Sequence, residues 1–194
     1  MENSLGSHFF IQKPCKRIIR YNGSNYFLSL PYCVFNFYYV DEMHNIPVAM
    51  GFCLSDGKEI FKSPIPNSSL FYCCLGDQNK QLHNYFDFKN GKLKNERKNL
   101  KRLTDHMISV FWQSDFNDDY DIDCCSYYNY LGNIYEWHLK TKEKGFVPKS
   151  EDLKKIKYDY NFTAFNSMKI SEKDFNYFRE KILKSIQELE KQNV

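Results

Sequence analysis

No run of apolar residues in this chain of 194 residues approaches the roughly 20 residues that a helix needs to cross a bilayer. The first residues, Met1-Glu2-Asn3-Ser4, do not have the charged and then apolar order of a secretory signal peptide. We therefore expect a cytoplasmic protein without a membrane partner. The net charge of +3 is too small and too dispersed to indicate nucleic acid as the partner.

The chain also contains no Cys-x-x-Cys motif, and neither of its adjacent cysteine pairs has a histidine at the spacing of a zinc finger. We therefore expect no structural metal. The number of cysteines is odd, which favours free thiols in a reducing compartment. The seven cysteines stand at positions 15, 33, 53, 73, 74, 124 and 125.

Aromatic residues are abundant, with 15 Tyr and 17 Phe, and this much aromatic area argues against disorder. In the first part of the chain, short apolar and β-branched segments alternate with turns. Asn22-Gly23 predicts a tight hairpin, because both residues tolerate positive φ. We predict an antiparallel β-meander over residues 9–76, preceded by a loose arm at 1–8. Its expected strands cover residues 9–11, 17–21, 26–30, 32–40, 48–54 and 59–61.

From residue 97 onwards the apolar period becomes helical. Leu100, Leu103, Met107 and Phe111 form one apolar stripe, which predicts an amphipathic helix. The sequence Ser171-Glu172-Lys173-Asp174 predicts the capped start of a long helix that runs towards the C-terminus. Strands first and helices afterwards indicate one α+β domain over residues 1–194, mainly helical from 97 to 194. Further helical segments are expected at residues 127–144 and 150–157.

The stretch 63–77 joins a turn rich in Pro, Ser and Asn to a short apolar segment with two adjacent cysteines. If that segment is extended, Cys73 and Cys74 point to opposite faces, so at most one thiol is expected at the surface. An exposed thiol with a lowered pKa is a nucleophile, and the side-chain amide of Asn67 could donate to a developing oxyanion. The alternative is that both sulfurs fill space in the core, as free cysteines often do.

Pro66-Asn67 followed by Cys74-Leu75 resembles the site of the ubiquitin-conjugating-enzyme superfamily, the UBC-like fold. In that superfamily a His-Pro-Asn turn precedes the cysteine that forms a thioester. The order of the wider motifs resembles divergent prokaryotic branches found in mobile elements and plasmids. The resemblance covers about residues 26–120, although Ile65 stands where the family has His. The motifs in question are Leu30-Pro31-Tyr32, Ile65-Pro66-Asn67, Cys74-Leu75-Gly76 and Phe111-Trp112-Gln113-Ser114-Asp115-Phe116-Asn117-Asp118-Asp119.

The resemblance implies that Cys74 accepts the tail of a ubiquitin-like modifier as a thioester and passes it to an amine. It implies that Asn67 stabilises the oxyanion. A functional interpretation of the stretch 111–119 places Asp118 or Asp119 beside the cysteine, where the carboxylate orients the incoming lysine. An activating enzyme and a modifier would be the partners, with no metal or organic cofactor. The residues of the stretch 111–119 themselves favour another interpretation, a helix end with Trp112 and Phe116 in the core and its acids in solvent.

Two other functions remain open from the sequence. A non-catalytic protein of the same fold, part of a mobile-element or phage complex, would bury Cys74 and use its surfaces to bind other proteins. A nucleic-acid accessory protein would use the basic stretch Lys89–Arg102, although such a stretch is more often a solvated face. Of the histidines, only His106 is kept as a possible pocket residue, on the helix face opposite the apolar stripe. Exposure of the Cys74 sulfur beside Asn67 separates catalysis from assembly.

Overall fold

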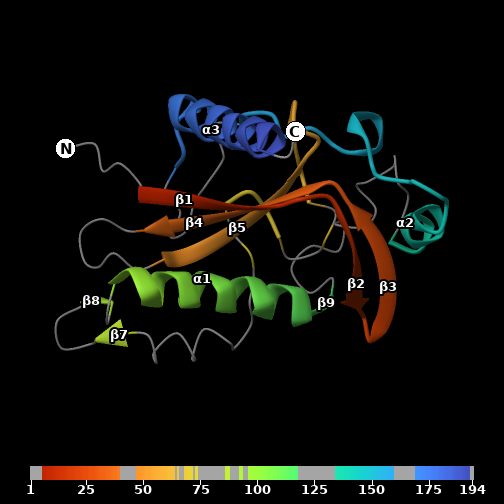
Figure 1. Ribbon diagram of the computed structural model, residues 1–194, viewed down its shortest axis with the longest axis horizontal. Coiled ribbons are helices and arrows are strands. Elements are labelled where there is room, and N and C mark those ends of the chain that lie inside the picture. The colour runs from red at the N-terminus through yellow and green to blue at the C-terminus, as the bar shows by residue number, and fades with distance from the viewer. Residues whose placement is uncertain are drawn as a thin grey trace.

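A long β-hairpin with a bend in its middle forms the centre of the fold (Figure 1). The computed structural model describes residues 6–39, 47–63, 65, 68–71, 73, 86–87, 92–93, 96–117, 134–159 and 169–192. Strands β1 (Gly6–Gln12) and β2 (Cys15–Tyr21) form one arm of the hairpin, and β3 (Ser24–Leu30) and β4 (Tyr32–Tyr39) form the other. The predicted turn joins the two arms, since Asn22 has a φ of 46° and Gly23 a φ of 74°.

The bend lies where two prolines face each other. Gln12 is opposite Cys33 on one side of the bend, and Cys15 is opposite Leu30 on the other. The same register therefore runs through the bend and places Pro14 opposite Pro31. Because proline has no backbone N–H, neither residue can donate to the ladder here. The arms consequently divide between two sheets, with strand orders β1-β4-β5-β6 and β3-β2-β9.

The remaining strands extend these sheets. β5 (Pro47–Ser55) pairs antiparallel with β4, and β6 (Ile60–Phe61) pairs with the end of β5. β9 (Asp115–Phe116) is parallel to β2, and β7 (Phe86–Asp87) pairs with β8 (Lys92–Leu93). The antiparallel order along the chain confirms the α+β class. However, β1 begins at Gly6, inside the stretch predicted as a loose arm, because its whole length pairs with β4.

Two helices cover opposite faces of the larger sheet. Figure 1 shows α1 (Glu96–Gln113) below the sheet and α3 (Glu172–Lys191) above it. Alternate strand residues point to opposite faces, so Phe35 and Phe52 pack in the core with Phe111 of α1. The core on the α3 side contains Val34 and Cys53 with Phe175, Phe178, Ile182 and Ile186.

The two long helices lie where the apolar stripe and the helix-cap sequence predict them. Leu103, Met107 and Phe111 of the predicted stripe are buried. The Ser171 hydroxyl accepts from the Asp174 backbone N–H at 3.1 Å, which confirms the predicted helix cap. α3 therefore begins where the sequence indicates.

The middle of the second half differs from the prediction. α2 covers only Ile134–Thr141 of the expected helix at 127–144, whose first part lies outside the described residues. The expected helical segment at 150–157 contains only the short 3-10 helix Ser150–Asp152. Lys155 instead bridges to Phe61, and this pairing straightens the chain. Among the helices of the described residues, none combines the length and apolar character that a membrane span requires.

Candidate active-site segment

The segment Ser63–Cys73 lies at an edge of β5 that β6 does not reach. β6 pairs only with Leu54 and Ser55, the last residues of β5. Further back along β5, the Phe52 backbone N–H donates to Ser69 O at 2.7 Å. The segment thus continues the sheet edge where the next strand stops.

Gly51 lets this segment approach the sheet closely. A Cβ atom at Gly51 would lie 1.9 Å from the Leu70 carbonyl oxygen, so only glycine fits at this position. Asn36, directly opposite Gly51 on β4, donates from Nδ2 to the same carbonyl oxygen at 3.0 Å. One backbone group, Leu70 C=O, therefore docks the segment onto two strands.

Serine hydroxyls hold the turn that begins the segment. Ser63 Oγ accepts from the Ile65 backbone N–H at 3.0 Å. Ser68 Oγ lies 2.8 Å from Ser63 Oγ and 2.6 Å from Ile65 O. Ser68 and Cys73 form an isolated antiparallel bridge, so the chain reverses between them. The backbone N–H and C=O of Ile65 are thus both bonded to serine side chains.

The residues of the segment divide between the two cores. Ile65 and Cys73 pack in the core on the α1 side, and Leu70 and Phe71 pack in the core on the α3 side. Cys73 is only 5% exposed. The apolar composition of the segment 71–75 predicts that it is buried, and this is confirmed for its two described residues, Phe71 and Cys73. At its described residues this stretch forms a bend and a single bridge instead of a strand. The reason is that the chain approaches Gly51 at Leu70 and then reverses direction.

The residues predicted to carry the chemistry are not among those described. Cys74, Asn67 and Asp118 all lie outside the described residues. Their roles stay predictions, and the structure contributes the geometry of the chain on either side of them.

The end of α1, predicted either as a site or as a helix end, is partly described. Phe116 is 2% exposed, and Trp112 packs against the same core. Asp115 pairs with Arg20 at 3.2 Å and accepts from the Gly23 backbone N–H at 3.1 Å. Trp112 and Phe116 therefore lie where the helix-end interpretation expects them. Asp115, which that interpretation places in solvent, instead holds the hairpin turn against the end of α1.

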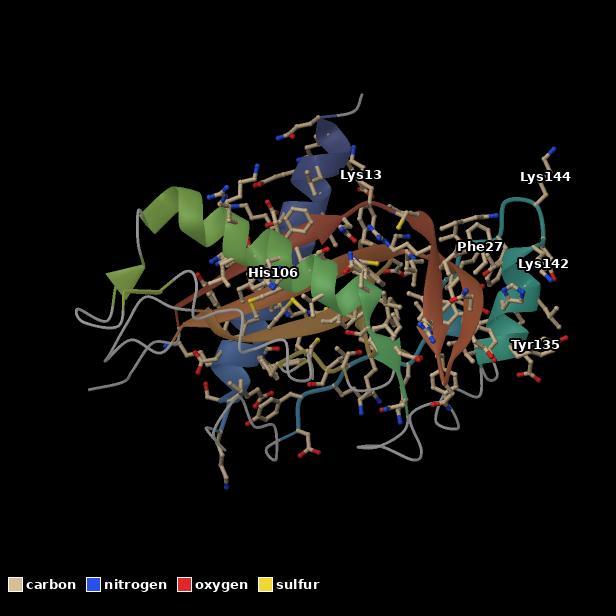
Figure 2. All side chains as sticks on the ribbon, turned by 90° about the horizontal axis from the view of Figure 1, so that it is seen from below. Lys13, Phe27, His106, Tyr135, Lys142 and Lys144 are labelled. Atoms are coloured by element: carbon tan, nitrogen blue, oxygen red, sulfur yellow. The ribbon has the colours of Figure 1, made fainter. Side chains whose placement is uncertain are left out.

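His106 does not lie on the solvent face of α1. Figure 2 shows His106 on α1. It is half-buried, and its neighbours in the helix Leu103, Met107 and Val110 are all buried. The prediction that His106 lies opposite the apolar stripe is wrong, because the buried face of α1 is wider than the stripe that was counted. Lys101 and Arg102 are exposed, as expected of a solvated basic face.

Sequence reasoning missed a second thiol site at the proline bend. Cys15 is half-buried, Cys33 is buried, and a hydrogen bond from the Cys33 side chain lowers the pKa of Cys15. Burial opposes this effect, and the nearby Arg17 guanidinium adds to it, so the pKa of Cys15 falls to about 6. Burial raises the pKa of Cys33 well above the usual range. The sequence feature that bears on this site is the Asn22-Gly23 turn. It predicts the register of the hairpin but not the bend that brings the two cysteines together.

An open cleft lies beside the same bend. Its volume is about 410 Å³, and its walls include Pro14, Pro31, Tyr32 and Val147. Asp56 also lines the cleft, but its carboxylate already accepts from the Lys58 and Glu59 backbone N–H groups at 2.9 Å. Lys58, Lys149 and Glu151 also line the cleft, so it combines apolar and charged walls.

No protein-family model matches this chain, and no curated protein or solved structure matches it either. Any function must therefore be argued from its own residues.

Proposed function

We propose that this chain is a diverged ubiquitin-conjugating-like protein that carries the tail of a modifier as a thioester on Cys74. The proposal is supported by the order of the four motifs in the sequence. It is also supported by the α+β architecture, in which a β-meander leads through the segment Ser63–Cys73 to the long helix α1. The partners would be a ubiquitin-like modifier and its activating enzyme.

The observation that carries the proposal is the burial of Cys73. Its side chain packs in the core on the α1 side, which gives Cys73 a packing role and supports assigning the proposed chemistry to Cys74 instead. The close docking of Leu70 on Gly51 and Asn36 would give a nucleophile four residues later a rigid base, as a positioned catalytic group requires.

The proposed reaction is two successive acyl transfers. The Cys74 thiolate attacks the thioester that joins the modifier tail to its activating enzyme. A new S–C bond forms, and the activating enzyme's thiolate leaves. An amine then attacks the Cys74 thioester, an amide forms and the Cys74 thiol is released. Asn67 would donate to the oxyanion of each tetrahedral intermediate, and Asp118 would orient the incoming lysine.

The test is the alkylation rate of each cysteine in the native protein between pH 5 and 9, resolved by peptide mass spectrometry. Because Cys15 also has a lowered pKa, the Cys74 rate is measured in a Cys15→Ser variant. We expect Cys74 to react rapidly and to remain reactive below about pH 7, where an ordinary thiol with a pKa near 8.5 is mostly protonated. Cys53, whose burial raises its pKa, is the internal control and should react only on unfolding.

If Cys74 reacts only after denaturation, the thioester proposal is wrong. The alternative is then a non-catalytic protein of the same fold that binds other proteins of a complex. One observation favours that alternative independently. Ile18 and Phe27 lie directly opposite each other on the β2–β3 hairpin, and are 64% and 39% exposed.

A further inference from the structure

Two cysteines from opposite arms of the hairpin meet beside the proline bend. Cys15 begins β2 and shares a strand face with Arg17 and Ile19, since alternate residues point the same way. Ile19 and Cys33 both belong to the core on the α1 side. The sulfur atoms of Cys15 and Cys33 are in hydrogen-bond contact. This pairing joins residues that are far apart in the sequence.

The two thiols have different surroundings. Cys33 is buried, with its Sγ 3.7 Å from Pro31 O. Cys15 is half-buried, so a small solute can reach it. The Arg17 side chain donates a hydrogen bond to Cys15, and its guanidinium is itself held 4.5 Å from the Trp112 ring. A fixed cation and a thiol donor thus both favour the thiolate at Cys15.

We propose that Cys15 is a peroxide-reactive thiol, and that Cys33 resolves its oxidised form into a disulfide across the proline bend. The proposal does not use Cys74, so it stands whether or not the thioester proposal does.

The chemistry takes two balanced steps. The Cys15 thiolate attacks one oxygen of hydrogen peroxide, an S–O bond forms, the O–O bond breaks, and hydroxide leaves and takes a proton to become water. This gives a sulfenic acid at Cys15. The Cys33 sulfur then attacks the Cys15 sulfur, the S–S bond forms, the S–O bond breaks and a second water leaves with the Cys33 proton. The net change is two thiols and one peroxide to one disulfide and two waters.

The bend gives the chain room for this bond. The two sulfurs must move from hydrogen-bond contact to about 2.05 Å. Pro14 and Pro31 have no backbone N–H, so the ladder lacks two of its donors at the place that must move. A shift there breaks fewer backbone hydrogen bonds than it would in the middle of β2 or β4.

Cys53 is a natural control for this site. It lies on β5 opposite Val34 and faces the core on the α3 side. Burial is the cause that raises its pKa. It should remain a thiol under conditions that oxidise Cys15.

The experiment is a titration of the native protein with hydrogen peroxide, followed by alkylation of the remaining thiols and peptide mass spectrometry. We expect a cross-linked peptide pair that contains Cys15 and Cys33 and is lighter by two hydrogens than the reduced peptides. At pH 6, Cys15 should react about tenfold faster than an ordinary exposed thiol. This figure combines a larger thiolate fraction with the lower nucleophilicity of a low-pKa thiol.

Two variants separate the roles of the two cysteines. Cys33→Ser keeps a hydroxyl donor beside Cys15 but cannot form the disulfide, so the sulfenic acid should accumulate and be captured by dimedone at Cys15. Cys15→Ser should leave Cys33 reduced. Arg17→Gln should slow the reaction of Cys15 without changing the product.

The proposal is overturned if the native protein gives no Cys15–Cys33 cross-link. It is also overturned if Cys33→Ser gives no dimedone adduct at Cys15, or if Cys15 is found linked to a different cysteine. Unlike the alkylation test for Cys74, each of these results depends on Cys15 and Cys33 alone. Failure here therefore leaves the thioester proposal unaffected, and failure of the thioester proposal leaves this one unaffected.

Discussion

Gly51 is the residue on which the placement of the candidate segment depends most directly. The segment crosses Gly51 so closely that the Leu70 carbonyl occupies the space of a side chain. The neighbouring Asn36 is fully buried and donates to the same carbonyl. A buried amide that loses its acceptor, or a buried carbonyl that loses its donor, costs stability.

We predict that Gly51→Ala destabilises the protein by about 3 kcal/mol, the upper part of the range for overpacking a core. The reason is that the clash is with backbone, which cannot rotate away. Urea unfolding measures the loss, and the exposed Ser109→Ala change in α1 is the control, with an expected change within about 0.5 kcal/mol. Wild-type stability in Gly51→Ala would mean that the segment can leave the sheet without cost.

A second change at the same contact tests whether the two residues act together. Asn36→Ala should cost about 1–2 kcal/mol, because it leaves Leu70 O without its side-chain donor. In the double variant the two losses should be less than additive, since both variants weaken the docking of Leu70. Full additivity in unfolding measurements would contradict a shared contact.

At the scale of elements, side chains of α2 form hydrogen bonds with the backbone of β3, which is an edge strand. Thr141 Oγ1 accepts from the Ser29 backbone N–H at 2.9 Å, and Trp137 Nε1 donates to Ser29 O at 3.1 Å. His138 Nδ1 lies 2.9 Å from the Phe27 N–H. Figure 2 shows Phe27 on the hairpin beside this helix. The backbone groups of an edge strand are thus bonded to a helix instead of to another strand.

We predict that Thr141→Val costs about 2 kcal/mol, because Val has the same shape but leaves the buried Ser29 N–H without an acceptor. Thr141→Ser keeps the hydroxyl and is the matched variant, so it should recover most of that loss. Amide hydrogen exchange at Ser29 should accelerate in the Val variant alone. Equal exchange in the two variants would contradict the role given to the hydroxyl.

The elements that the sequence predicted are those with local signals. The Asn22-Gly23 turn, the apolar stripe of α1 and the cap of α3 each depend on residues within a few positions of one another. β9, the pairing of Lys155 with Phe61 and the contact of α2 with β3 join residues that are distant in the chain. No local pattern encodes those partners, which is why the sequence missed them.

The candidate site follows the same division. If the segment were extended, at most one of the two adjacent cysteines would be exposed, and Cys73 is indeed buried. Its burial comes with a bend and a single bridge, however, and not with the strand on which the prediction was based. The Cys15–Cys33 contact was missed because it requires the hairpin to bend at two prolines that are apart in the sequence and opposite in the fold. The Pro, Ser and Asn residues from Ser63 onwards predicted the turn. The docking of Leu70 on Gly51 could not be predicted in this way, because it depends on a strand that precedes the turn by more than ten residues.

At the scale of the whole molecule, one carboxylate links three parts of the chain. Glu59, just before β6, pairs with Lys155 and with Arg179 of α3, the latter at 2.6 Å. The segment that carries Lys155 is itself hydrogen-bonded to β6, through Ile156 N to Ile60 O at 3.0 Å. The edge of the sheet, the chain beyond α2 and the last helix are therefore held at one point.

This network should contribute to stability in a pH-dependent way. Burial raises the pKa of Glu59, but the hydrogen bonds and charges of Lys155 and Arg179 outweigh it, so the pKa is lowered. A lowered folded-state pKa gives stability that is fully present above the unfolded value of about 4.3. That stability is lost as the pH falls through the lower folded value.

We predict that Glu59→Gln is less stable than the wild type by about 1 kcal/mol near neutral pH, a modest amount because the pairs are partly exposed. The difference should shrink as the pH falls, since the wild-type carboxylate then takes up its proton. Urea midpoints of both proteins between about pH 7 and about pH 3 test this. A difference that stays constant with pH would show that Glu59 acts by shape and not by charge.

The single register of the bent hairpin has a consequence for how the chain folds. The two ladders of the hairpin, Tyr21–Ser24 to Cys15–Leu30 and Gln12–Cys33 to Gly6–Tyr39, keep the same register on both sides of the bend. Once the turn has closed, each further pair requires only one more residue from each arm, so the entropy of loop closure is met in small increments. We therefore expect the hairpin to form first at Asn22-Gly23. The strand pairs would then form one after another outwards from the turn and past the two prolines. In this order of folding, the hairpin forms before α1 and α3 cover the larger sheet. The contacts at Gly51 and Glu59, which join residues far apart in the sequence, form last.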